Sequence, residues 1–355
     1  VALLYRKISF KNIFTLLSSY VLMLFFNNHF YSKISNLTNY IEINSDVPAQ
    51  WIKIADLIYN QGLFHAYTNN VIRGQGLYLN YIQTIIFRIN FQLENFQFVR
   101  LNANLLLIFS LFLFIDFKIS KKNKVLISLI FITLILNSDW LTYLFADSLM
   151  LEGLVSLFFA IFILNTKNYL NPKLNIKSLI FYLFFGLILF SKQFIATLAL
   201  LYLVYIFIFK KNMNVVGSFF IFGVEKFFSN RYLPEDIEFA YLGGRSFRDL
   251  FFDILNFNNI ELGVAVSIYE EFSRDRITTL IFIIFLIVNL SSIVKKQSWT
   301  ESSAFYLVLL NIVFVVILYI SWWKNFEVQS SFRYILNSLH LVILSLAYKT
   351  ESLKS

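Results

Sequence analysis

The stretch LFSKQFIATLALLYLVYIF, residues 189–207, decides which class of fold this chain adopts. It contains the end of one apolar segment, 178–191, and most of the next, 194–209, with a short polar turn around Lys192 between them. Two long apolar segments joined by so short a turn are typical of helices that cross a membrane one after the other. The rest of the chain repeats this pattern, so the number and orientation of such segments predict the fold.

The composition of the whole chain favours a membrane protein over a soluble one. Hydrophobic residues make up 58% of the 355 residues and charged residues only 14%, whereas a soluble domain carries about 25% charged residues. The chain has no cysteine, which excludes disulfide bonds and thiolate sites. Its net charge of +9 comes from lysines and arginines that lie mostly between apolar segments. Membrane topology explains this charge, so no nucleic-acid partner is expected.

The expected fold is an all-α polytopic membrane protein with about ten transmembrane helices and an outward-facing first loop that carries amphipathic helices. The ten apolar segments are residues 12–29, 101–117, 125–137, 148–164, 178–191, 194–209, 213–224, 277–294, 303–321 and 333–348. Segment 76–92 stays open between an interfacial helix, a re-entrant helix and an extra crossing. Residues 1–355 are therefore expected to form a single transmembrane domain, without a separate soluble domain.

The charges of the loops orient these segments. When the loops alternate between two sides, one side receives most of the lysines, including Lys167, Lys173, Lys177, Lys210 and Lys211, and the other receives most of the acids. The positive-inside rule makes the lysine-rich side cytoplasmic. We therefore expect a bacterial inner (plasma) membrane protein with a cytoplasmic N-terminus, whose first segment is an uncleaved signal anchor. Outer segments 30–100 and 225–276 then carry the function.

The first outer loop places an acid beside an amphipathic helix. Pro48 suits the first turn of a helix, Gly62 suits its C-terminal stop, and apolar residues recur at helical spacing between them. Residues 48–61 are therefore expected to lie as a helix along the outer membrane surface. Asp46 precedes this helix, where it either caps the helix or acts as a catalytic base at the membrane surface. The two roles are compatible, because a capping carboxylate is also an oriented one.

A second group of acids opens segment 148–164. Asp147 stands at the outer start of this segment, and Glu152 lies deeper on an otherwise apolar helix. An ionisable group inside a crossing is costly and usually faces a polar cavity or a partner, although a Glu this near the interface can instead stay hydrated. Asp147 is a candidate catalytic residue or a helix cap. Glu152 and the distant Tyr334 are candidates for lining a polar cavity.

Three cationic residues are candidates for binding a phosphate at the outer face. Lys192 lies on the side that the lysine-rich loops avoid, Arg333 opens the last apolar segment, and Arg245 follows two glycines in the acidic outer loop. Arginine matches a phosphate group in bidentate fashion. Each residue also has an ordinary interpretation, as a snorkelling lysine, an interfacial anchor and part of a basic surface helix.

No motif for a metal, a nucleotide or a serine nucleophile occurs in the sequence. His65 has no second histidine at metal-binding spacing, and His340 is expected to be a hydrogen-bonded packing residue rather than a metal ligand. No cofactor is therefore expected, and a divalent metal stays an open alternative.

These residues together resemble the C-type superfamily of integral membrane glycosyltransferases, which take a sugar from a polyprenyl-phosphate carrier. The resemblance rests on four stretches: SDVPAQWIKIADLIYNQGLFHAY at 45–67, LFADSLMLEGLVSLFFAIFIL at 144–164, SKQ at 191–193 and FRYIL at 332–336. It covers residues 1–210 well and the rest poorly. Many members have Asp-Glu in the first loop, whereas Val47 follows Asp46 here. Many also carry a C-terminal soluble domain, which is not expected here.

The resemblance implies a sugar transfer from a polyprenyl-phosphate donor to a glycan, lipid or protein acceptor at the outer face, as part of glycan biosynthesis for the cell envelope. By analogy with the family, Asp46 is the base or positions the acceptor, and Asp147 assists it or, as in some members, helps to hold a metal. Lys192 and Arg333 bind the lipid phosphate.

Other classes of function also fit a polytopic protein with a large outer loop. A transporter or flippase of lipid-linked glycans predicts charges near the middle of its helices and helices interrupted by Gly or Pro, and these segments contain few of either. A polymerase or ligase of such glycans predicts essential Arg and His in its outer loop, and 225–276 contains Arg but no His. A membrane scaffold without enzymatic activity is the remaining alternative.

Overall fold

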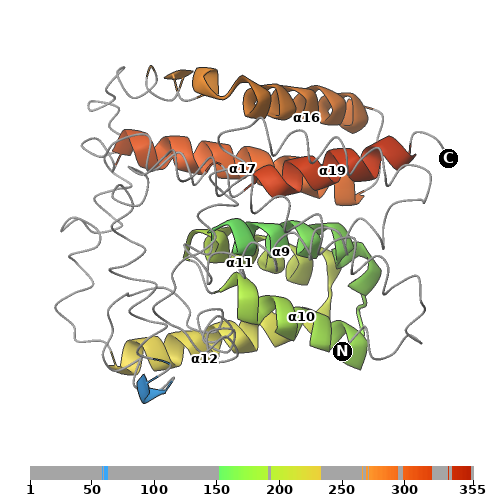
Figure 1. Ribbon diagram of the computed structural model, residues 1–355. Coiled ribbons are helices and arrows are strands. Elements are labelled where there is room, and N and C mark those ends of the chain that lie inside the picture. The colour runs from blue at the N-terminus through green and yellow to red at the C-terminus, as the bar shows by residue number, and fades with distance from the viewer. Residues whose placement is uncertain are drawn as a thin grey trace, which may run out of the picture.

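The computed structural model describes residues 58, 60–62, 152–190, 193–232, 266, 269–270, 272–294, 299–321, 335 and 338–352 (Figure 1). Within these ranges the regular structure is helical and contains no strand. The all-α part of the expected fold class is therefore confirmed for this part of the chain. Apolar segments 12–29, 101–117 and 125–137, and the ambiguous segment 76–92, lie outside it.

Seven α-helices of the described part fall on seven of the expected apolar segments. They are α9 (Glu152–Asn165), α10 (Ile176–Leu189), α11 (Gln193–Lys210), α12 (Val216–Tyr232), α16 (Arg276–Val294), α17 (Trp299–Ser321) and α19 (Leu339–Ser352), with the 3-10 turns η3 (Thr166–Tyr169) and η4 (Met213–Val215). The helical state of these segments is confirmed. Among the residues that the structure describes, no helix has both the length and the apolar character needed to cross a membrane.

The last apolar segment begins differently from the sequence-based expectation. The sequence predicts one helix over 333–348. In the structure Ile335 is helical as expected, but Ser338 lies in a turn and α19 starts at Leu339. The backbone N–H of Ser338 donates to the carbonyl oxygen of Ile335 at 3.1 Å, which is the short i to i+3 bond of a tight turn. A polar side chain from α17, described below, also bonds to this turn, and apolar periodicity gives no sign of it.

The helix α9 is central in the described part. It contacts α10, α11, α17 and α19, while α12 packs on α10, and α16 packs on α17 and α19. Figure 1 shows the resulting layers: α16 lies at the top, α17 and α19 lie below it, α9 and α11 follow, and α10 and α12 lie at the bottom. Contacts therefore join α9, α17 and α19, although they are far apart in the sequence.

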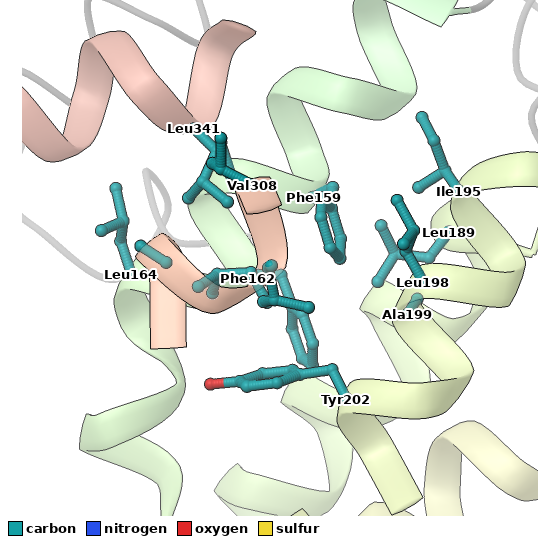
Figure 2. Close-up of a cluster of buried hydrophobic side chains, with 14 of the residues drawn as sticks. Phe159, Phe162, Leu164, Leu189, Ile195, Leu198, Ala199, Tyr202, Val308 and Leu341 are labelled. Carbon is teal, nitrogen blue, oxygen red and sulfur yellow. The ribbon is translucent and has the colours of Figure 1, made fainter. Parts of the chain in front are cut away.

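Aromatic rings fill the space between α9, α10 and α11. Phe162 of α9 is fully buried, and its ring lies 5.5 Å from that of Phe181, 5.9 Å from that of Tyr182 and 6.0 Å from that of Tyr202. The contacts with the two tyrosines are edge-to-face, a favourable geometry for aromatic pairs. Figure 2 shows Phe162 and Tyr202 in the same buried cluster as Val308 of α17 and Leu341 of α19. This cluster holds the central helix against both of its neighbouring layers.

Small residues bring α10 and α12 close together. A Cβ atom at Gly186 would lie 3.1 Å from the Cα of Ser218, and one at Gly217 would lie 3.1 Å from side-chain atoms of Leu179 and Leu183. The hydroxyl of Ser218 donates to the backbone carbonyl of Tyr182 at 2.5 Å. The absence of a Cβ at both glycines therefore lets the two helix backbones approach closely, and the hydrogen bond from Ser218 connects them.

The sequence-based stop signal of the first outer helix is present in the structure. Ile58, Asn60 and Gln61 are helical, and Gly62 has a positive φ of 87°. The N–H of Gly62 donates to the carbonyl of Ile58 at 3.0 Å, which is the bond expected where a left-handed glycine ends a helix. The C-terminal end predicted for the helix 48–61 is therefore confirmed, and its first residues, together with Asp46, lie outside the described part.

Candidate functional site

Four buried polar side chains meet between α9, α17 and α19, and we call this group the polar centre. Its members are Ser156 of α9, Asn311 of α17, Ser338 of the turn before α19 and His340 of α19. At most 3% of each residue is exposed. Burying polar groups among apolar helices is costly unless hydrogen bonds compensate for the lost water. The bonds within this group are therefore important for how the three helices fit together.

A hydrogen bond between Ser156 and His340 joins α9 to α19. The Ser156 Oγ and the His340 Nδ1 lie 2.7 Å apart, and the tautomer of the ring decides which of them donates. Ser156 is the fifth residue of α9 and His340 the second residue of α19. Because both residues are near the start of their helices, this bond sets the beginning of α19 against the beginning of α9. The expectation that His340 is a hydrogen-bonded packing residue is confirmed.

A second set of bonds holds the turn that precedes α19. The Asn311 Nδ2 donates to the Ser338 Oγ at 3.1 Å and to the backbone carbonyl of Ile335 at 3.3 Å. The Ser338 hydroxyl donates to the same carbonyl at 2.9 Å. This carbonyl thus accepts bonds from an amide of α17 and a hydroxyl of the turn. As a result, α17 fixes the place where α19 begins.

The serine–histidine pair does not form an accessible catalytic centre in this structure. A hydroxyl 2.7 Å from an imidazole nitrogen has the spacing of a nucleophile and its base. Both residues, however, have no exposed surface, so a substrate does not reach them. The arrangement can instead position the chain segments on either side of it.

Ring contacts establish that α10 returns toward the start of α9. Tyr169, just beyond the end of α9, stacks on Phe181 with ring centroids 4.0 Å apart. Phe158, nearer the start of α9, packs against Phe184 at 6.3 Å. The later part of α10 is therefore closer to the beginning of α9. Phe190 follows Leu189, the last residue of α10. Hence the end of α10 approaches the same end of α9 as the polar centre does.

Three parts of the chain therefore lie at the N-terminal end of α9. They are α9 at Ser156, the end of α10 at Leu189 and Phe190, and the residues Ile335, Ser338 and His340. Figure 2 shows Leu189, with Ile195 of α11, in the buried cluster that includes Phe159 of α9. In sequence, these parts are the neighbours of Glu152, Lys192 and Arg333.

The side chains of the sequence-predicted site itself are not among those that the structure describes. Glu152 is the first residue of α9, and its side chain lies outside the described part. The remaining candidates that lie outside it are Asp46, Asp147, Lys192, Arg245, Arg333 and Tyr334. In the described ranges, no three His, Asp or Glu side chains are grouped as ligands for a metal.

Three members of the polar centre were not singled out from the sequence. Ser156, Asn311 and Ser338 are polar residues within apolar segments, and that contrast was the available signal. A single serine or asparagine in such a segment is common, however, and its partner here is 184 residues away for Ser156 and 27 residues away for Asn311.

Comparison of this chain with known protein families, curated proteins and solved structures finds no match.

Proposed function

We propose that this chain is a polytopic membrane glycosyltransferase, which transfers a sugar from a polyprenyl-phosphate donor to an acceptor at the outer face of the membrane. The observation that carries the proposal is the meeting of three chain segments at the N-terminal end of α9. The bond from Ser156 to His340 joins the helix that carries Glu152 to the segment that follows Arg333. The ring contacts between α9 and α10 bring the chain just before Lys192 toward the same end of α9. Such a transfer requires a carboxylate and cationic groups in one site.

The distribution of apolar side chains supports the membrane location. On α16, one face carries Leu280, Ile283, Ile284, Ile287 and Leu290, each between 42% and 62% exposed. The opposite face, which includes Phe282 and Phe285, is buried, and so is the polar Asn289. A soluble protein seldom exposes a continuous apolar stripe of this kind, whereas lipid tails solvate it. The exposed apolar stripe and the buried polar residues together favour contact with lipid.

The proposed reaction is a single displacement. A hydroxyl oxygen of the acceptor attacks the anomeric carbon of the sugar, and the bond from that carbon to the phosphate oxygen breaks. Polyprenyl phosphate leaves with the electron pair, Asp46 takes the hydroxyl proton as general base, and the anomeric configuration inverts. Lys192, Arg333 and Arg245 stabilise the charge on the leaving phosphate, and Asp147 assists Asp46.

The polar centre has a positioning role in this proposal. Ile335 is two residues after Arg333 in the sequence, and its carbonyl oxygen accepts bonds from Asn311 and Ser338. Glu152 is four residues before Ser156, a rise of about 6 Å along a helix. The polar centre therefore constrains the distance between the acid-bearing and the arginine-bearing segments. Glu152 and Tyr334 then contribute to a polar cavity beside the reacting groups.

One observation favours the transporter or flippase alternative. The turn at Ser338 interrupts the last apolar segment, and Asn311 bonds to it within the buried core. Interrupted helices with buried polar groups are typical of binding sites in secondary transporters. A flippase moves an intact lipid-linked sugar across the bilayer, whereas a transferase releases free polyprenyl phosphate. The two functions are therefore distinguished by their products.

The experiment is a product assay with the purified full chain in liposomes. Polyprenyl-phosphate hexoses and pentoses are supplied together with glycan, lipid and protein acceptors that carry free hydroxyl groups. Both released polyprenyl phosphate and the sidedness of intact donor are measured. The proposal expects release by the natural protein and none by Asp46→Asn, with equal membrane insertion. Asp56→Asn, in the same outer segment, is the matched control and should retain release. Release by Asp46→Asn at the natural rate removes the base assignment, and donor movement without release favours the flippase.

A further inference from the structure

Two loops are tied together at the other end of α9, α10, α11 and α12. Asn214 of η4 donates through Nδ2 to the backbone carbonyls of Asn171 at 3.0 Å and Lys173 at 2.9 Å. Its Oδ1 accepts from the backbone N–H of Asn175 at 2.7 Å. Asn214 is fully buried. A single side chain therefore joins the loop between α9 and α10 to the loop between α11 and α12.

A second asparagine strengthens this connection. The Asn212 Nδ2 donates to the backbone carbonyl of Tyr169 at 3.2 Å and to the hydroxyl oxygen of Tyr182 at 2.8 Å. The preceding residue, Lys211, has a positive φ of 51°, which costs a residue with a side chain roughly 1–2 kcal/mol. Such a conformation persists where the surrounding structure determines it. The hydrogen bonds of Asn212 hold the backbone beside Lys211 in this conformation, so the two loops have a defined shape.

Five exposed lysines lie on these loops and at the adjoining helix ends: Lys167, Lys173, Lys177, Lys210 and Lys211. The sequence from Gly153 to Val224 contains no Asp or Glu, so the two loops that carry these lysines contain no acid of their own. Because the asparagines fix the loops to each other, the lysines form one positively charged surface. We call it the lysine surface.

Large apolar side chains are exposed among these lysines. They are Leu174, Ile176, Phe209, Met213 and Val216, each between 44% and 69% exposed. A surface that only meets water would not need such residues beside its charges. Lysines next to exposed apolar side chains suit the boundary of a bilayer, where the apolar groups enter the lipid and the ammonium groups reach the headgroups. This combination distinguishes a lipid surface from a nucleic acid as the partner.

We propose that the lysine surface binds the anionic headgroups of the adjacent phospholipid leaflet. The headgroup phosphates complement the ammonium groups of Lys167, Lys173, Lys177 and Lys211, and the exposed apolar residues enter the region below them. This inference rests on the membrane location in the proposed function, but it does not depend on sugar transfer. Binding of this kind fixes how deep this end of the four helices lies in the membrane. It thereby also fixes the depth of their opposite end, where the proposed reaction takes place.

The test uses native mass spectrometry of the purified full chain, equilibrated with equal amounts of phosphatidylglycerol and phosphatidylcholine. The natural protein should retain phosphatidylglycerol preferentially, and added salt should weaken the preference. One lysine at a membrane surface contributes roughly a fivefold preference. The preference of the variant Lys173→Gln/Lys177→Gln/Lys211→Gln for phosphatidylglycerol over phosphatidylcholine should therefore be at least fivefold lower than that of the natural protein. Its arginine counterpart at the same three positions should keep it.

The control variant is Lys295→Gln/Lys296→Gln, which removes lysines of another loop that is expected on the same side. Equal loss in this control overturns the proposal, because the effect would then reflect total charge. An unchanged preference in the triple glutamine variant also overturns it. Competition by soluble glycerol phosphate or by RNA, at concentrations that displace the lipid, would assign the surface to another ligand. The outcome of the transfer assay does not affect these results.

Discussion

Replacing Ser156 and His340, singly and together, tests the bond that joins α9 to α19. Each of Ser156→Ala and His340→Leu is expected to lower the free energy of unfolding by about 1–3 kcal/mol, since each removes a buried hydrogen-bonding group. Hydrogen bonds between helices in a bilayer contribute about 0.6 kcal/mol on average and up to about 1.7 kcal/mol. This bond is 2.7 Å long and joins two residues without exposed surface. We therefore expect a coupling energy near the upper value, of about 1–1.5 kcal/mol.

The assay is reversible unfolding of the full chain in mixed micelles, with the four members of the cycle measured under the same conditions. A pair formed by Ser156→Ala and Ser218→Ala is the control, because Ser218 bonds to the carbonyl of Tyr182 on α10 and lies outside the polar centre. The control pair should be additive within about 0.3–0.5 kcal/mol. If Ser156 and His340 are equally additive, the bond does not hold the two helices together and the reasoning is refuted.

Three further changes have expected effects on thermal unfolding of the full chain. Gly217→Val should destabilise by about 1–3 kcal/mol, because an added Cβ would lie 3.1 Å from side-chain atoms of two leucines. Gly223→Ala is the control and should be neutral or stabilising, because an added Cβ there would have no heavy atom within 4 Å. Equal losses of stability at both positions would contradict the close approach of α10 and α12. Asn214→Ala should cost about 1–3 kcal/mol, because it removes three bonds from a fully buried side chain to the backbone of the other loop. An unchanged midpoint would show that the two loops are held otherwise. Gly62→Ala should cost about 1 kcal/mol through its left-handed backbone, and no loss would argue against that conformation.

The positions of the described helices could be predicted because they depend on local sequence. Continuous apolar runs mark them, and the stop at Gly62 follows from the ability of glycine to adopt a positive φ. The end of α12 was harder to place. This helix continues through a polar stretch to Tyr232, beyond the apolar segment 213–224, so apolar content did not mark its end.

Contacts between distant residues could not be predicted in the same way. Neither the bond between Ser156 and His340 nor the bonds from Asn214 to the preceding loop leave a periodic pattern in the sequence, because each depends on how whole helices pack. The same holds for the turn at Ser338, which a side chain of α17 stabilises. The candidate site was predicted as a set of residue types, whereas the meeting of its neighbouring segments at one end of α9 became evident only from the structure.

The central claim is that Asp46 and Arg333 share one site at the outer face of the membrane. The most direct test of it is cross-linking of Asp46→Cys with Arg333→Cys in sealed vesicles. The natural chain has no cysteine, so a short bifunctional thiol reagent that does not cross the membrane reacts only at the introduced positions. The account predicts a cross-link when the reagent is added on the non-cytoplasmic side, and none for the pair Asp46→Cys and Lys211→Cys. Absence of a link between positions 46 and 333, or a link formed only from the cytoplasmic side, would contradict a shared outer site.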